Sequence, residues 1–301
     1  MSHAHAGHSH APVSFGRAFA VGAALNVVYV VVEAVYGFLS GSLALVADAG
    51  HNLSDVFGLL LAWGAAYLAT RPPTPRRTYG LRRSSVLAAM FNAVFLLVAI
   101  GAIAWEAIRR FERPEPVAGG TVMIVAGLGI LVNGFTAMMF AKGQEGDINV
   151  RGAFLHMAAD ALVSLAVVAA GFAMRLTGRA WIDPAMSLLV VAVIAWSTWG
   201  LLRQSFDLAL DAVPEGIDPS AVRDYLAGQP GVVDVHDLHI WAMSTTETAP
   251  TVHLVCPGGV DDERLRAIGD DLHDRFGIEH PTIQVERGGQ GECPMAPKEV
   301  L

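Results

Sequence analysis

Six stretches of this chain are each long and apolar enough to cross a lipid bilayer, and this feature constrains the fold more than any other. A membrane helix needs about 20 mainly apolar residues, because every backbone N–H and C=O must be paired within the hydrocarbon. Gly and Ala recur in several stretches at helix-packing spacing, which favours a tight bundle. We predict six membrane helices, over residues 15–38, 43–69, 85–108, 119–141, 150–174 and 180–202.

The charge distribution divides the chain after Arg203. Up to that residue there are 14 basic and 10 acidic residues, whereas the remainder holds 6 basic and 18 acidic residues, a net charge of −12. Only 16% of the chain is charged, against about a quarter in a typical globular protein. The acidic part excludes a basic nucleic-acid binder and would concentrate cations near the apolar part.

After Arg203 the pattern predicts a small α+β domain. Asp218-Pro219 is an N-cap with proline at the first helical position. Alternation and turn signals then place the remaining elements. The expected order is a helix over 218–228, strands over 232–243 and 251–256, a helix over 260–276 and a strand over 282–286. The domains are therefore a His-rich tail over 1–14, a transmembrane domain over 15–203, a soluble domain over 204–288 and a tail over 289–301.

The positive charges predict the orientation. With both termini inside, the inside segments carry nine Lys and Arg residues and the outside loops carry five, which favours cytoplasmic termini. The two cysteines, Cys256 and Cys293, form no disulfide framework and fit a reducing compartment. The polar N-terminus has no signal-peptide layout. We expect a multi-pass protein of a bacterial-type inner (plasma) membrane.

Two of the predicted membrane helices carry the same pattern, His-x-x-x-Asp. His51 precedes Asp55 by four residues, and His156 precedes Asp160 by four. This spacing puts both side chains of a pair on one helix face, one turn apart. Ionisable residues inside a membrane are costly and mark a function. If the two faces meet, two imidazoles and two carboxylates form a tetrahedral ligand set suited to zinc or a similar divalent metal.

The alternative interpretation is that each pair is a hydrogen bond that holds helices together. Other polar residues in the apolar stretches also have a functional or a structural interpretation. Asp48 either supports the ligands or packs between helices, and Asp183-Pro184 is interpreted as a helix cap. The remaining ones line a path or form interhelical hydrogen bonds: Asn26, Glu33, Asn92, Glu106 and Asn133.

Several stretches resemble the cation diffusion facilitator family of membrane metal transporters. The strongest are residues 42–55, SLALVADAGHNLSD, and residues 149–164 around the second His-x-x-x-Asp pair. RTYG at 77–80 and HDLHIW at 236–241 also fit, so the resemblance covers nearly the whole chain. His-x-x-x-Asp on both helices is similar to the zinc-transporting branch. The family's transport site falls on His51, Asp55, His156 and Asp160.

The resemblance also implies a homodimer with six membrane helices per protomer and a cytoplasmic ferredoxin-like domain. In that domain His236, His253 and Glu286 fall on positions that bind metal in some relatives. His236 and His253 on neighbouring strands either share an ion or pack as ordinary polar side chains, whereas His239, three residues from His236, is expected to face the opposite side. The His-rich loop of many zinc members is missing from residues 142–147. If metal capture has a place in this chain, it falls to the N-terminal tail, which holds His3, His5, His8 and His10; the alternative is an inert tail.

Together these features predict a secondary transporter that exports Zn²⁺ from the cytoplasm in exchange for protons. One alternative is a membrane metal sensor or receptor without transport. Another is an exporter of broader specificity that also accepts Cd²⁺, Co²⁺ or Fe²⁺. An intramembrane enzyme is not expected, because the sequence lacks His-Glu-x-x-His and the four ligands close the metal shell.

Overall fold

A computed structural model describes residues 16–141 and 148–288. The two predicted tails, 1–14 and 289–301, and the His-free connector 142–147 lie outside the described residues. The described chain forms two compact units. The first comprises the described parts of Met1–Phe57 and Phe95–Thr198, and the second comprises Gly58–Val94 and the described part of Trp199–Leu301.

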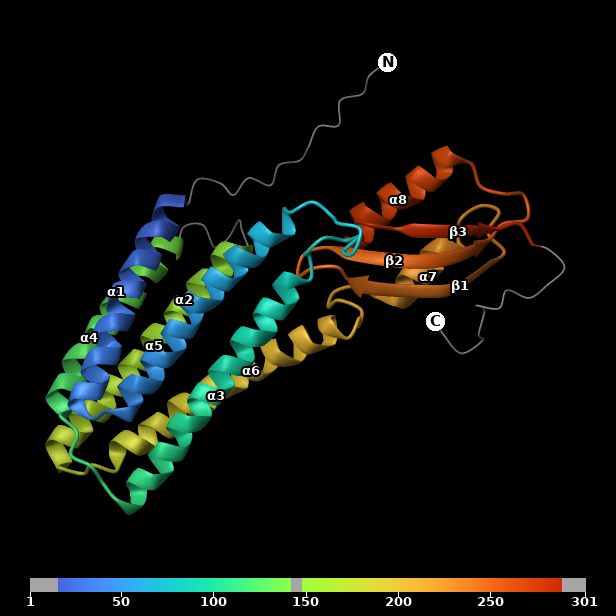
Figure 1. The fold of residues 1–301 in the computed structure, drawn as a ribbon. Helices are drawn as coiled ribbons and strands as arrows, with labels where there is room; N and C mark the ends of the chain where they lie inside the picture. The colour runs from blue at the N-terminus through green and yellow to red at the C-terminus, as the bar shows by residue number, and fades with distance from the viewer. Residues whose placement is uncertain (1–15, 142–147, 289–301) are drawn as a thin grey trace. The chain divides into compact units, whose positions relative to one another are not determined.

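All six predicted membrane helices are present (Figure 1). They are α1 (Gly16–Ser40), α2 (Leu43–Ala69), α3 (Ser84–Glu112), α4 (Gly119–Ala141), α5 (Ile148–Thr177) and α6 (Ile182–Ala209). Within the described residues, α2 to α6 are long and apolar enough to cross a membrane, and the described apolar part of α1 is Ala24–Ser40. Most edges agree with the prediction to within about one turn, but α6 continues to Ala209 rather than ending at 202.

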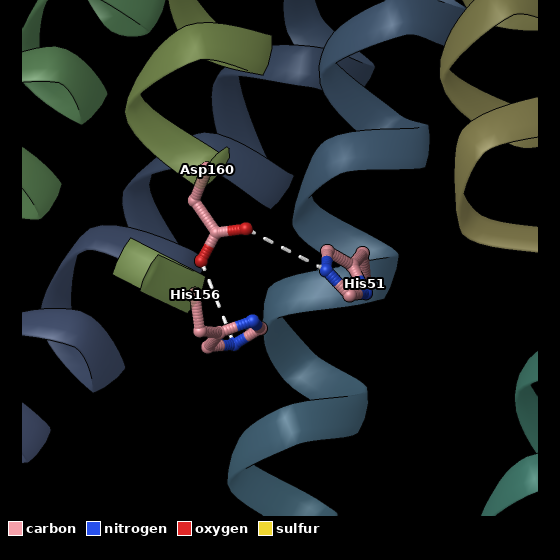
Figure 2. A group of neighbouring side chains, drawn as sticks. All are labelled: His51, His156 and Asp160. Atoms are coloured by element: carbon pink, nitrogen blue, oxygen red, sulfur yellow. Dashed lines mark ion pairs between the residues drawn. The ribbon is translucent and has the colours of Figure 1, made fainter. Parts of the chain in front are cut away.

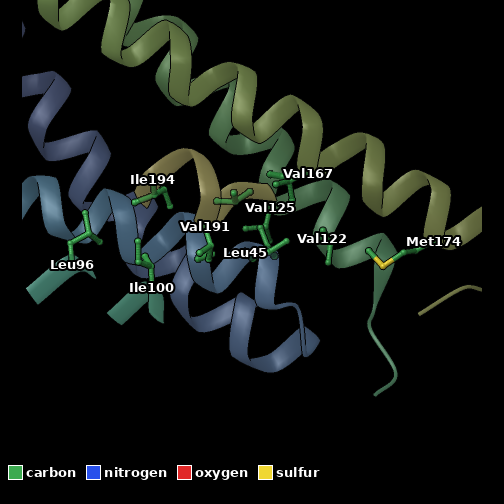
Figure 3. Close-up of a cluster of buried hydrophobic side chains, with 13 residues drawn as sticks. Leu45, Leu96, Ile100, Val122, Val125, Val167, Met174, Val191 and Ile194 are labelled. Atoms are coloured by element: carbon green, nitrogen blue, oxygen red, sulfur yellow. The ribbon is translucent and has the colours of Figure 1, made fainter. Parts of the chain in front are cut away.

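The first unit is held together by a buried apolar cluster between its helices. Leu45 of α2, Ile100 of α3 and Val122 of α4 are among its fully buried members, and Figure 3 shows them with their neighbours. Helix α4 packs along α5 and α1. The backbones of α4 and α5 approach closely where Gly119 faces Gly171, since a Cβ on Gly171 would lie 3.0 Å from the Gly119 carbonyl oxygen.

Asp183 does not have the role that the sequence suggested. It lies in the first turn of α6, but its carboxylate caps the start of α2 instead. It accepts hydrogen bonds from Ser42 Oγ at 2.5 Å and from the Leu43 backbone N–H at 2.8 Å. Ser42 Oγ in turn accepts from the Leu45 N–H at 3.2 Å. The interpretation as a cap of the sixth helix is wrong because the unpaired N–H groups of α2 provide buried donors for a fully buried carboxylate.

The C-terminal domain has the predicted α-β-β-α-β order. Its elements are α7 (Pro219–Ala227), β1 (Asp234–Ala242), β2 (Thr248–Val255), α8 (Asp262–Phe276) and β3 (Thr282–Glu286). The sheet order is β1-β2-β3, with β1 antiparallel and β3 parallel to β2. A buried cluster including Leu226 of α7, Leu254 of β2 and Leu272 of α8 joins the helices to the sheet.

Local signals fix the helices of this domain. Asp218 caps α7 through the Ser220 N–H, and Asp261 caps α8 through the Arg264 N–H. Between the helices, burial and a hydrogen bond to Asp271 raise the pKa of Tyr225 to about 12. The predicted fold class, a helical membrane domain followed by a small α+β domain, is confirmed.

Candidate metal centre

The two His-x-x-x-Asp pairs come together in the first unit. Helix α2 carries His51 and Asp55, and helix α5 carries His156 and Asp160. Figure 2 shows three of these side chains directed toward one another, with Asp160 between the two imidazoles. The ligand atoms of these three residues all lie within 4.8 Å of one another. The polar face of each helix, predicted from spacing alone, therefore points at the other.

Four contacts close a ring between the pairs, and each imidazole uses its Nε2 atom. His51 Nε2 lies 3.7 Å from Asp55 Oδ2 and 3.7 Å from Asp160 Oδ1. His156 Nε2 lies 3.1 Å from Asp55 Oδ2 and 3.6 Å from Asp160 Oδ2. Each of these two histidines thus contacts both carboxylates, one on its own helix and one on the other helix.

These distances can be compared with those of a zinc shell. Ligand atoms about 2.0–2.2 Å from a tetrahedral ion are separated from each other by about 3.3–3.6 Å. The four nitrogen–oxygen distances, 3.1 to 3.7 Å, differ from that range by no more than a few tenths of an ångström. The imidazole rings are 5.9 Å apart between centroids and nearly perpendicular, at 80°. Asp55 contacts both imidazoles but does not belong to the group of three residues whose ligand atoms all lie within 4.8 Å of one another.

The four side chains differ in exposure. Asp160 is 5% exposed and His51 is 18% exposed, whereas Asp55 and His156 are 36% and 41% exposed. Within the described part of the chain, His51 Nδ1 and Asp160 Oδ2 are buried and have no hydrogen-bond partner. The cluster therefore has a buried side and an open side, and the two buried atoms without a hydrogen-bond partner could act as metal ligands.

A buried polar network lies beside this cluster. Tyr29 Oη donates to Glu33 Oε1 at 2.7 Å, and Asn52 Nδ2 donates to Glu33 Oε2 at 3.1 Å. Asp48, which the sequence could not assign, accepts a hydrogen bond from Ser164 Oγ at 3.4 Å and so links α2 to α5. A Cβ on Gly129 of α4 would lie 2.2 Å from Tyr29 Oη and 2.8 Å from Ser164 Oγ, so only glycine leaves room for both hydroxyls.

The other polar residues of the membrane helices, expected to line a path or to form interhelical hydrogen bonds, differ in their contacts. Glu33 forms an interhelical hydrogen bond, and Asn26 Nδ2 contacts Met157 Sδ at 3.5 Å. Glu106 pairs with Arg109 and Arg110 of its own helix. Both amide atoms of Asn133 are buried without a hydrogen-bond partner among the described residues. The sequence interpretation missed Tyr29 and Asn52. The i, i+4 spacing from Asp48 could have indicated Asn52.

A second cluster lies on the sheet of the C-terminal domain. His236 of β1 pairs with His253 of β2 in register, with ring centroids 5.3 Å apart. Glu286 Oε1 of β3 lies 2.9 Å from His253 Nδ1 and 3.6 Å from His236 Nε2. The three residues each offer one ligand atom, and these atoms lie within 4.8 Å of one another. The three predicted residues are therefore brought together.

A β-bulge separates this cluster from His239. The register of β1 against β2 shifts between His236 and His239, and Asp237 between them has a φ of 54°. Asp237 Oδ1 contacts His239 Nε2 at 3.0 Å, and its Oδ2 lies 3.6 Å from His253 Nε2. His239 is exposed and does not belong to the three-residue cluster. The prediction that it faces the opposite side from His236 is wrong, because the bulge pairs His236 with His253 and His239 with Thr251, and these two partners share one face of β2.

His273, His280 and Cys256 belong to neither cluster. His273 and His280 are exposed, and a hydrogen bond with Asp274 raises the pKa of His273. Cys256 is a buried free cysteine, and burial raises the pKa of its thiol. Cys293 and the N-terminal histidines, His3, His5, His8 and His10, lie outside the described residues.

Comparison with known proteins now places the chain in a family. Residues 19–208 match the family described as cation efflux transmembrane domain, and residues 214–288 match the cytoplasmic domain of cation efflux proteins. The metal-bound C-terminal domain of the CzcD transporter from Cuprividus metallidurans is 39% identical, and the match covers 23% of this chain and 99% of that domain with a TM-score of 0.22.

Full-length relatives match along most of both chains. The cation efflux system protein CzcD of Alcaligenes sp. (strain CT14) is 37% identical over 93% of this chain and 90% of its own length. The zinc transporter ZitB of Escherichia coli (strain K12) is 40% identical over 86% and 83%. The cadmium, cobalt and zinc/H(+)-K(+) antiporter of Bacillus subtilis (strain 168) is 33% identical over 93% and 92%. The chain therefore belongs to the cation efflux family and is a divalent metal cation efflux transporter, not an enzyme.

Proposed function

We propose that this transporter exports Zn²⁺ from the cytoplasm in exchange for protons, through a tetrahedral site of His51, Asp55, His156 and Asp160. The observation that carries the proposal is the closed ring of four nitrogen–oxygen contacts between α2 and α5, at 3.1 to 3.7 Å. Two neutral imidazoles and two carboxylates neutralise a dication while replacing its water shell, which suits passage through a low-dielectric region.

Zinc is the favoured substrate because of the ligand set. Imidazole nitrogen and carboxylate oxygen in a four-coordinate arrangement are typical zinc ligands, whereas Mg²⁺ and Ca²⁺ prefer six or more oxygens. The relatives' names are consistent with this choice, since one is a zinc transporter and another is named for cadmium, cobalt and zinc. Broader specificity for Cd²⁺, Co²⁺ or Fe²⁺ is the alternative, because geometry, ligand type and metal availability, rather than affinity alone, set the selectivity of such a site.

Proton exchange follows from the ligand chemistry. An imidazole binds metal only when it is neutral, so zinc and protons compete for His51 and His156. Histidine titrates close to physiological pH, which makes this competition effective on both sides of the membrane. Movement of the helix bundle then alternates access to the two sides. The Bacillus subtilis relative is named as an antiporter of metal against protons and potassium, which supports exchange as the mode of transport.

The proposed orientation has both termini in the cytoplasm of an inner-membrane protein. An even number of membrane helices puts the two ends on the same side. Residues 214–288 match a domain described as cytoplasmic, and the Lys and Arg excess in the predicted inside loops agrees with that side. The bacterial source of the relatives favours the plasma membrane.

The cluster of His236, His253 and Glu286 is proposed as a regulatory metal site. Dimerisation through the cytoplasmic domain is typical of the family, and the part of the chain after Arg203 carries a net charge of −12. Two such domains repel each other, and a dication bound in each reduces that repulsion. Metal in this cluster would therefore favour the paired domains.

The transport site is tested by zinc flux into proteoliposomes that hold a zinc-sensitive dye. His51→Ala and Asp160→Ala each remove one ligand and are expected to abolish flux. His273→Ala, which removes an exposed histidine of α8, is the matched control and is expected to keep the native rate. Native flux in His51→Ala would refute the site assignment.

The same vesicles test exchange and specificity. A trapped pH dye should report proton movement opposite to zinc movement. Zinc binding without any flux would instead support a sensor or receptor, and zinc flux without proton movement would refute exchange. Competition by Cd²⁺, Co²⁺ and Fe²⁺ at equal concentration measures whether the site is restricted to zinc.

A further inference from the structure

Five polar side chains beside the proposed metal site are almost completely buried. They come from α1, α2 and α5, and each is 3% exposed or less. We refer to them as the Glu33 cluster, which consists of Tyr29, Glu33, Asp48, Asn52 and Ser164. No metal ligand belongs to it, and the proposed transport mechanism gives it no role.

The centre of this cluster is a contact between two carboxyl groups. The Glu33 and Asp48 carboxyl groups lie within hydrogen-bonding reach of each other. The other contacts are all donors to these carboxyls, from Tyr29 Oη at 2.7 Å, Asn52 Nδ2 at 3.1 Å and Ser164 Oγ at 3.4 Å. A hydrogen bond between two carboxyl groups needs a donor, and only a proton on one of them supplies it.

The surroundings of the two carboxyls also require that proton. Among the described residues, neither Glu33 nor Asp48 forms an ion pair with Lys or Arg. Helix α4, which packs along α1 and α5, contains no titratable residue between Gly119 and Ala141. The titratable groups nearest the pair are Tyr29 of α1 and, beyond Asp48, the proposed ligands of α2 and α5. Two adjacent buried charges of one sign are strongly disfavoured, so one carboxyl stays neutral.

We propose that Glu33 holds a proton that it donates to Asp48 in the metal-free protein, and that this proton leaves to water when a dication binds the four proposed ligands. The inference rests on the proposed function. Asp48 precedes His51 by one helical turn, and Ser164 follows Asp160 by one turn, so the dication binds next to this cluster. Its positive charge stabilises the ionised pair.

The donors around Glu33 stabilise its ionised form. Once the proton has left, Tyr29 Oη and Asn52 Nδ2 still donate one hydrogen bond to each carboxylate oxygen. Because Asn52 is the next residue after His51, the carboxyl is tied to the helix that carries the ligand. Glu33 is thus a proton-binding residue of the exchange that is separate from the four metal ligands.

The test is the number of protons released per zinc bound, measured by titration calorimetry of the full chain in buffers of different ionisation enthalpy. Glu33→Gln has the shape of the protonated acid and keeps a donor for Asp48. It is expected to bind zinc at native stoichiometry but to release about one proton fewer per zinc. Glu106→Gln, which removes a carboxyl paired with Arg109, is the control and should release the native number.

A second variant and a measurement on the native protein cover the case in which Glu33→Gln does not fold. Asp48→Asn removes the other half of the pair and is expected to lose the same proton. In the native protein, zinc should reduce the infrared carbonyl band of a protonated carboxylic acid. An unchanged band, or equal proton counts in native protein and Glu33→Gln, overturns the inference even when His51→Ala abolishes flux. Native flux in His51→Ala overturns the proposed metal site instead.

Discussion

The Asp183 carboxylate is expected to contribute strongly to stability, because it holds the start of the helix that carries His51 and Asp55. It is fully buried and accepts two hydrogen bonds, from Ser42 Oγ and from the Leu43 N–H. Hydrogen bonds to a charged acceptor contribute about 1.5–3 kcal/mol each. Asp183→Ala removes both and leaves two buried donors unpaired, so we expect a loss of about 3–5 kcal/mol in the free energy of unfolding.

Thermal unfolding of the purified protein in detergent, followed by circular dichroism, measures this loss. At about 2–4 °C per kcal/mol, Asp183→Ala should melt at least about 6 °C below the native protein. Asp183→Asn keeps an oxygen for the Leu43 N–H but loses the charge at the helix N-terminus, so its loss should be about 1–2 kcal/mol. Asp207→Ala removes an exposed carboxylate from the same helix and should change nothing. Equal melting temperatures for Asp183→Ala and Asp207→Ala would refute the capping argument.

Three further predictions concern other parts of the chain. Gly129→Ala should destabilise the protein by about 1–3 kcal/mol because its Cβ overlaps Tyr29 Oη; Gly127→Ala on the same helix, with no atom within 4 Å of its Cβ, should not, and equal melting temperatures would contradict the close approach. The raised pKa of Tyr225 means that the folded domain gains stability from the neutral phenol below about pH 10 and loses it as the pH rises toward 12, so the tyrosinate absorbance of the native protein should show a step near pH 12 that Tyr225→Phe lacks. His253→Ala should lower the zinc bound per chain at equilibrium dialysis by about one ion. It should also remove the stabilisation of the domain by zinc, which is about 2.7 kcal/mol at a hundredfold excess over Kd and is observed as a rise in melting temperature. Undiminished zinc content would exclude this cluster as a site.

The membrane helices were predictable because their length is set by the bilayer and not by tertiary contacts. The edges of α2 and α4 agree with the prediction to the residue. The His-x-x-x-Asp spacing predicted which side chains share a face of each helix, since that depends only on helical periodicity. Whether the two faces meet depends on how the helices pack. The sequence therefore predicted a shared ligand set only on the condition that they do.

Other features could not be predicted because they join residues far apart in the chain. The partner of Asp183 lies 141 residues away at Ser42, and the local Asp-Pro pattern pointed to the wrong helix. Glu33 stood out as a charged residue in an apolar stretch. Nothing in the sequence spacing indicated that Asn52 and Asp48 of α2 lie beside it. The bulge at Asp237 depends on the pairing of β1 with β2, which local alternation does not encode.

The unequal exposure of the four proposed ligands has a consequence for how an ion would lose its hydration. The more open pair, Asp55 and His156, comes from two different helices, and so does the more enclosed pair, His51 and Asp160. A hydrated ion arriving from the open side would exchange its first waters for Asp55 and His156, and the last ones for the enclosed pair. Dehydration is thereby divided into two smaller steps, and each of them already bridges α2 and α5.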